Sequence, residues 1–187
     1  MKNVILLGDS IRMQYQEPVG KKLADIANVC GPEENGRWSG YLLNSLRFWL
    51  PSLPSPDLVQ WNAGLWDMGD DYQEGRHFYP LDLFEETCHR ICRILRKVTE
   101  KPDLPIIIAT TTPTMHGDHG DILLYNDILK KVATEENAAV NDLYSVIAPI
   151  KEQMIGEDHL HLTPEGVEAV AEQTAGIIRR MLNGNPV

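Results

Sequence analysis

Short apolar runs alternate with longer amphipathic stretches along the chain, and this alternation constrains the fold more than any other feature. The runs are nearly continuous in apolar character, as strands buried on both faces of a parallel sheet should be. Strands are predicted at Val4–Leu7, Asp25–Val29, Leu58–Asn62, Ile106–Thr110 and Ala138–Asn141. Helices are predicted at Arg12–Leu23, Ser39–Leu50, Leu81–Thr99, Asp121–Glu136 and Pro164–Leu182. Strand and helix in regular alternation predict an α/β fold, a parallel sheet covered by helices on both faces.

Composition and charge exclude several classes of function. The chain has 187 residues, of which 43% are hydrophobic and 24% charged, as expected of a single globular domain over residues 1–187. Lys and Arg number 17 against 27 for Asp and Glu, so the formal net charge is -10. Because no basic stripe is present to neutralise phosphates, we expect no nucleic-acid partner and no attachment to membranes. The oligomeric state is left open.

The cysteines and the N-terminal segment bear on the compartment. The chain has three cysteines, Cys30, Cys88 and Cys92, and they lack zinc-finger spacing. This odd number excludes a disulfide framework, which fits a reducing compartment. Cys88 and Cys92 lie one helical turn apart, which predicts two neighbouring thiols in the core. The apolar run Val4–Leu7 is too short for the hydrophobic region of a signal peptide or for a membrane span. We therefore expect a cytoplasmic protein.

A first reactive motif, Gly8-Asp9-Ser10, follows the first predicted strand and precedes a helix. Ligands of open α/β sheets bind at the carboxyl ends of the strands. Ser10 would lie near a helix N-terminus, where free backbone N–H groups and the helix dipole favour a developing anion. Gly8 would permit close approach of the backbone. The motif favours Ser10 as a nucleophile, and the alternative is that Asp9 or Ser10 simply caps the helix.

A second motif lies just before the last predicted helix, which Thr163 and Pro164 begin as N-cap and first helical residue. Asp158 precedes His161 by three residues on a turn, so its carboxylate can fold back onto the imidazole. It would fix the tautomer and stabilise the imidazolium, as a Ser-His-Asp triad requires. His159 is expected to point elsewhere, as a surface histidine.

Together, the two motifs resemble those of the SGNH (GDSL-type) hydrolases, a family of esterases and lipases. The resemblance extends over nearly the whole chain, in blocks at Gly8–Ser10, Asn35–Gly40, Asp57–Asp67 and Asp158–Gly166, with Ile11 in place of the Leu of the family's four-letter name. It implies a flavodoxin-like, three-layer α/β/α domain with about five parallel strands. It also implies Ser10 as nucleophile, His161 as general base and Asp158 as the residue that orients the base, with no cofactor.

The family completes an oxyanion hole with a Gly backbone N–H and an Asn side chain, beside the nucleophile's own N–H. Gly40 fits the family pattern best, with Gly36 as a rival. The third block carries Trp66 where the family has its Asn, and Asn62 lies nearby in the sequence. We therefore expect an oxyanion hole formed by Ser10, Gly40 and Asn62, with Trp66 as the alternative to Asn62.

Aromatic residues near the predicted carboxyl edge of the sheet are candidates for contact with substrate. Trp38, Trp61 and Trp66 are expected there, and core packing is the ordinary role for each. The alternative is that their faces stack on a sugar ring. Asp9, Trp38 and Trp66 are therefore expected to contact the substrate.

The expected activity is a metal-independent serine esterase that cleaves small acyl groups, above all acetyl, from a small-molecule ester such as an acylated sugar. A chain of this size leaves little room for a lid, which favours small acyl groups over long-chain lipids. Two alternatives stay open. One is an inactive ligand-binding domain that lost catalysis through Trp66. The other is a metal-dependent hydrolase that uses His116, Asp118 and His119.

Overall fold

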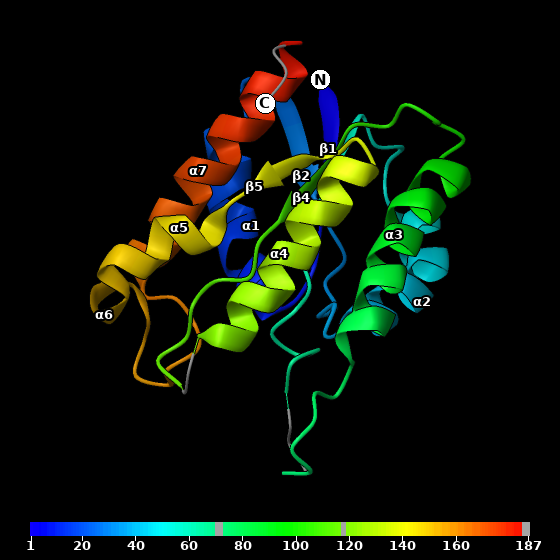
Figure 1. The fold of residues 1–187 in the computed structure, drawn as a ribbon. Coiled ribbons are helices and arrows are strands. Elements are labelled where there is room, and N and C mark those ends of the chain that lie inside the picture. The colour runs from blue at the N-terminus through cyan, green and yellow to red at the C-terminus, as the bar shows by residue number, and fades with distance from the viewer. Residues whose placement is uncertain (70–72, 117–118, 185–187) are drawn as a thin grey trace.

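The computed structural model describes residues 1–69, 73–116 and 119–184, which form a five-stranded parallel sheet flanked by helices (Figure 1). The strand order is β2-β1-β3-β4-β5. The strands are β1 (Lys2–Leu7), β2 (Ala27–Cys30), β3 (Leu58–Trp61), β4 (Ile106–Ala109) and β5 (Ala139–Asn141). This is the flavodoxin-like order, in which β1 and β3 meet at the topological switch point. A ligand crevice is therefore expected outside the carboxyl ends of these two strands.

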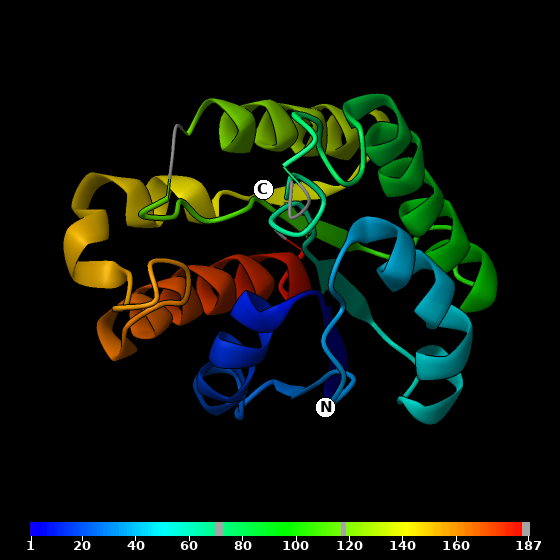
Figure 2. The same ribbon diagram turned by 90° about the horizontal axis from the view of Figure 1, so that it is seen from below.

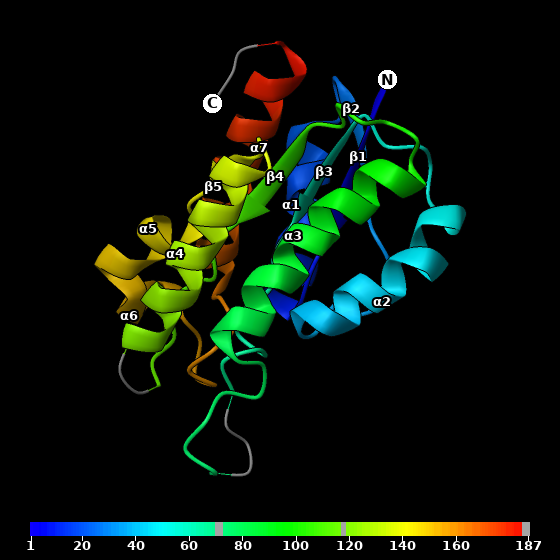
Figure 3. The ribbon, with the colours of Figure 1, turned by 45° about the vertical axis from the view of Figure 1, so that its right-hand side comes forward.

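Helices cover both faces of the sheet, which confirms the predicted three-layer α/β/α fold (Figures 2 and 3). One face carries α1 (Ser10–Lys22), α5 (Leu143–Ile147) and α7 (Pro164–Leu182), and α6 (Lys151–Met154) packs on α7. The other face carries α2 (Ser39–Trp49), α3 (Leu81–Val98) and α4 (Gly120–Glu135). Along β1, Val4 and Leu6 pack in the apolar core between the sheet and α1 and α7. Ile5 and Leu7 pack in the core on the opposite face, against α2, α3 and α4.

Helices α1 and α7 pack against each other, and both begin at the carboxyl edge of the sheet (Figures 1 and 2). The Asp9 side chain caps α1 by accepting a hydrogen bond from the Ile11 N–H at 3.0 Å. The Thr163 hydroxyl caps α7 by accepting from the Gly166 N–H at 3.2 Å, and Pro164 is the first helical residue, as predicted. Two well-capped helices therefore bring the beginning of the chain to the loop before α7.

The structure differs from the sequence prediction at several boundaries. Strand β2 begins at Ala27 and not at Asp25, because the backbone N–H groups of Ile26 and Ala27 both donate to the carbonyl of Leu23 in a turn. Helices α5 and α6 were not predicted, since five and four residues are too few to show helical periodicity. Among the helices of the described residues, none is both long and apolar enough to cross a membrane.

Candidate active site

Ser10 is the first residue of α1, directly after the turn that leaves β1. Gly8 in this turn has a φ of 145°, a conformation that favours glycine. A Cβ at Gly8 would also overlap the amide oxygen of Asn62, so no larger residue fits there. The backbone therefore turns sharply enough to present Ser10 at the N-terminus of a helix.

His161 connects Ser10 to Asp158. The Nε2 atom of His161 lies 2.8 Å from Ser10 Oγ, and its Nδ1 atom lies 2.6 Å from Asp158 Oδ2. The hydrogen bond from His161, followed by the backbone N–H groups of His161 and Leu160, lowers the pKa of Asp158 to about 2. An ionised Asp158 fixes the proton of His161 on Nδ1, which leaves Nε2 free to accept the proton of Ser10.

Gln14 fixes the loop that carries these residues, a role that the sequence did not indicate. Its side-chain amide donates to the Leu162 carbonyl at 3.1 Å and accepts from the Leu162 N–H at 3.1 Å. Gln14 lies one turn after Ser10 on α1, so both side chains face the loop before α7. That spacing is the only signal in the sequence that could have identified it.

His159 has a different environment from His161. Its ring stacks on His116 with centroids 5.2 Å apart, and its carbonyl accepts from the Met115 N–H at 2.8 Å. It therefore joins two loops at the carboxyl edge, and it is exposed.

The two glycines proposed for the oxyanion hole differ in the use of their N–H groups. The Gly36 N–H donates to the Gly8 carbonyl at 2.8 Å, so it is already engaged. Gly40 is the second residue of α2, and among the described residues no bonded partner of its N–H is found. Since the first N–H groups of a helix lack intrahelical partners, the geometry favours Gly40 over Gly36 as a donor to a developing anion.

Asn62, which follows β3, and Asp9, which precedes Ser10, are almost fully buried. Asn62 is 4% exposed and Asp9 1%, and the Asn62 side chain hydrogen bonds to the Asp9 carboxyl group. Burial raises the pKa of Asp9, and the hydrogen bonds from Asn62 and Ile11 oppose that shift. Such burial argues against the expected contact between Asp9 and substrate, because the carboxyl group supports α1 from within. A catalytic role of Asn62 stays a prediction.

The predicted aromatic contacts separate into a core residue and two rim residues. Trp61 is fully buried beneath the sheet edge and packs in the core. Trp66 is 46% exposed. Trp38 is half-buried, with ring centroids 5.3 Å from Tyr41 and 5.5 Å from the exposed Phe78. Trp38, Trp66 and Phe78 thus offer aromatic surface on the loops at the carboxyl edge.

The loop proposed as a metal site is only partly described, since Asp118 lies outside the described residues. His119 uses its two ring nitrogens on the Thr114 carbonyl at 2.8 Å and the Tyr144 hydroxyl at 3.1 Å. His116 stacks on His159. Both imidazoles therefore have contacts that hold the loop in place.

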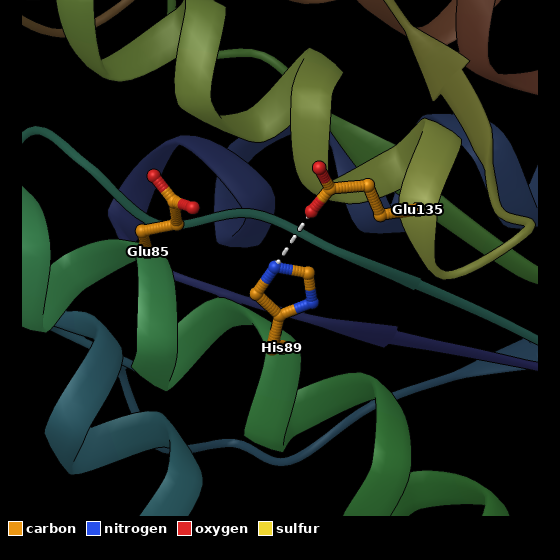
Figure 4. A group of neighbouring side chains, drawn as sticks. All are labelled: Glu85, His89 and Glu135. Atoms are coloured by element: carbon orange, nitrogen blue, oxygen red, sulfur yellow. Dashed lines mark ion pairs between the residues drawn. The ribbon is translucent and has the colours of Figure 1, made fainter.

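A different group of potential metal ligands lies between α3 and α4, formed by Glu85, His89 and Glu135 (Figure 4). His89 Nε2 is 3.1 Å from Glu135, and its Nδ1 is 2.8 Å from Glu136. Glu85 pairs with Lys131 at 2.6 Å. Because each of these side chains already contacts a partner across the two helices, we interpret the cluster as a bridge between α3 and α4.

Comparison with known proteins places the fold. No protein-family model matches the sequence, and no curated protein matches it. The acetyl xylan esterase AlAXEase has a TM-score of 0.76 and 21% identity, covering 94% of this chain and 99% of its own. Axe2, an acetylxylan esterase from Geobacillus stearothermophilus, has a TM-score of 0.74 and 19% identity, covering 95% and 94%. A lipase/acylhydrolase from Enterococcus faecalis has a TM-score of 0.72 and 19% identity, covering 96% of each chain. The protein therefore has the fold of the SGNH (GDSL-type) hydrolases.

Proposed function

We propose that the protein is a serine esterase that hydrolyses small acyl esters, in particular acetyl groups on carbohydrates, without a metal ion. The observation that carries the proposal is the continuous hydrogen-bonded chain from Ser10 through His161 to Asp158, at 2.8 and 2.6 Å. Its position outside the carboxyl end of β1, beside the switch point of the sheet, supports a substrate crevice there.

The reaction follows from this geometry. Ser10 Oγ attacks the ester carbonyl while its proton passes to Nε2 of His161, and the Asp158 carboxylate stabilises the imidazolium. The N–H groups of Ser10 and Gly40 hold the oxyanion of the tetrahedral intermediate. His161 then returns the proton to the leaving alkoxide. Water, activated by the same histidine, hydrolyses the acyl-enzyme and frees Ser10.

The substrate class has separate support. Two structurally similar proteins are acetyl xylan esterases. The exposed side chains of Trp66 and Phe78, with Trp38 in edge-on contact with Phe78, supply aromatic surface on which a sugar ring can stack. Acetyl esters of carbohydrates therefore fit the site better than long acyl chains, and the inactive binding domain is not favoured.

Labelling with a fluorophosphonate probe tests the proposal directly. The probe should add one phosphonyl group to Ser10, detected by intact mass, and Ser10→Ala should remain unlabelled. Hydrolysis of an aryl acetate should continue in EDTA. An unlabelled protein without acetate turnover would exclude the esterase, and turnover that EDTA abolishes and zinc restores would indicate a metal-dependent enzyme instead.

A further inference from the structure

Helix α2 begins without a capping side chain of its own. Trp38 is at the N-cap position and makes no side-chain cap. A distant residue takes that role, because the Ser39 N–H donates to both carboxylate oxygens of Asp67, at 2.9 and 3.1 Å. The third and fourth N–H groups of α2 donate to the Trp38 carbonyl. The Gly40 N–H thus lies between N–H groups that are held in place.

Asp67 is itself held firmly. Its side chain is fully buried and also accepts the Ser39 hydroxyl hydrogen bond at 2.5 Å and one from the Gly64 backbone N–H. Its carbonyl accepts from the Tyr79 N–H at 2.8 Å. The carboxylate therefore ties the loop after β3 to the first turn of α2, and its negative charge suits a helix N-terminus.

We propose that Asp67 is a positioning residue for the esterase reaction, because it anchors the first turn of α2 and so holds the Gly40 N–H toward the oxyanion beside Ser10. The inference rests on the proposed function, and it adds a residue that contacts neither substrate nor nucleophile. Catalysis is sensitive to such an anchor, since a displacement of about 1 Å in a positioned group lowers rates by about 100-fold.

Protonation of Asp67 should weaken the anchor. Burial raises the pKa of Asp67 to about 6, against the lowering effect of the hydrogen bonds from Ser39. The titratable groups that face it are Asp9 at the start of α1, Cys88 on α3 and Tyr125 on α4, none of them cationic. A protonated Asp67 has one acceptor oxygen fewer for the N–H and O–H groups around it. Activity should therefore fall as Asp67 is protonated.

The test compares kcat and KM for an aryl acetate across about pH 5 to 8 in the wild type, Asp67→Asn and Asp57→Asn. Asp57 is the matched control, because it also accepts a backbone N–H, that of Asn3 at 2.8 Å, but at the amino edge of the sheet. We expect Asp67→Asn to lower kcat about 10- to 100-fold with KM within about twofold. Its log kcat should vary less steeply with pH below about pH 6 than that of the wild type, because the side chain at position 67 no longer titrates. Asp57→Asn should match the wild type.

The outcomes separate this inference from the proposed function. A wild type without turnover would contradict the esterase itself. An active wild type with Asp67→Asn equal to it in kcat and acid slope would overturn the positioning role, and so would a variant changed only in KM. If circular dichroism shows Asp67→Asn unfolded, Ser39→Ala replaces it, since it deletes only the hydroxyl bond. Its kcat should fall about 3- to 10-fold, and an unchanged kcat would overturn the inference.

Discussion

Replacing Gln14 with Met tests whether the loop before α7 must be anchored to α1 for activity. Methionine keeps the length of the side chain and removes both hydrogen bonds to Leu162. Each bond contributes about 0.5–1.5 kcal/mol, so the loss is about 1–3 kcal/mol. Leu162 is only 6% exposed, so water cannot readily replace the two hydrogen bonds that its backbone loses. If the whole loss falls on the placement of His161, kcat decreases about 5- to 150-fold at 1.4 kcal/mol per factor of ten.

Steady-state hydrolysis of an aryl acetate and thermal unfolding measure the two effects of this substitution. We expect a lower kcat, a nearly unchanged KM and a modest fall in Tm. Gln173→Met is the matched control, because this residue lies on α7 and no side-chain hydrogen bond is found for it within the described part of the chain. A Gln14→Met enzyme with wild-type kcat and a lowered Tm would refute the reasoning, since the anchor would then serve stability alone.

Three further predictions concern the site and its surroundings. Ser10→Ala and His161→Ala should each remove nearly all acetate turnover while circular dichroism stays native, and His159→Ala should cost far less. Asn62→Ala should lower kcat by about 10² to 10³ with little change in KM if its amide binds the oxyanion. A smaller loss would indicate that Asn62 only supports Asp9 through their hydrogen bond. Because the pKa of Asp67 is raised from 3.8 to about 6, the native state binds more protons than the unfolded state between these values. The contribution of Asp67 to the free energy of unfolding should therefore fall as pH rises from about 4 to 6. In urea titrations, the free energy of unfolding of Asp67→Asn should depend less on pH than that of the wild type.

The layers of the fold were predictable because each central strand is apolar along its length. Val4–Leu7 and Ile106–Ala109 are buried on both faces, so every residue in them is apolar and the runs are recognisable as buried strands. Helix α3 was equally clear, since its buried residues recur at helical spacing. Short elements were not predictable, because α5 and α6 are fixed by packing on neighbours and not by their own periodicity.

The site divides along the same line. Ser10, Asp158 and His161 were predicted together because each lies in a short local motif at a helix start, and the structure brings their side chains into contact. Gln14 and Asp67 were not predicted, because their partners lie 148 and 28 residues away in the sequence. A hydrogen bond at such a separation depends on how α1, α2 and α7 pack, and a local signal such as the spacing of Gln14 from Ser10 does not identify the distant partner.

The packing of α1 on α7 has a consequence for when activity can first arise. Ser10 and His161 are separated by 151 residues, so a chain emerging from a ribosome contains the proposed nucleophile long before the proposed base. Under the proposed mechanism, Ser10 stays unactivated until the loop before α7 packs beside it, and acetate turnover should then report the docking of α7 on α1. In refolding experiments, the return of turnover should lag behind the return of the helical circular dichroism signal. Catalytic activity would then be a probe for a late step of folding.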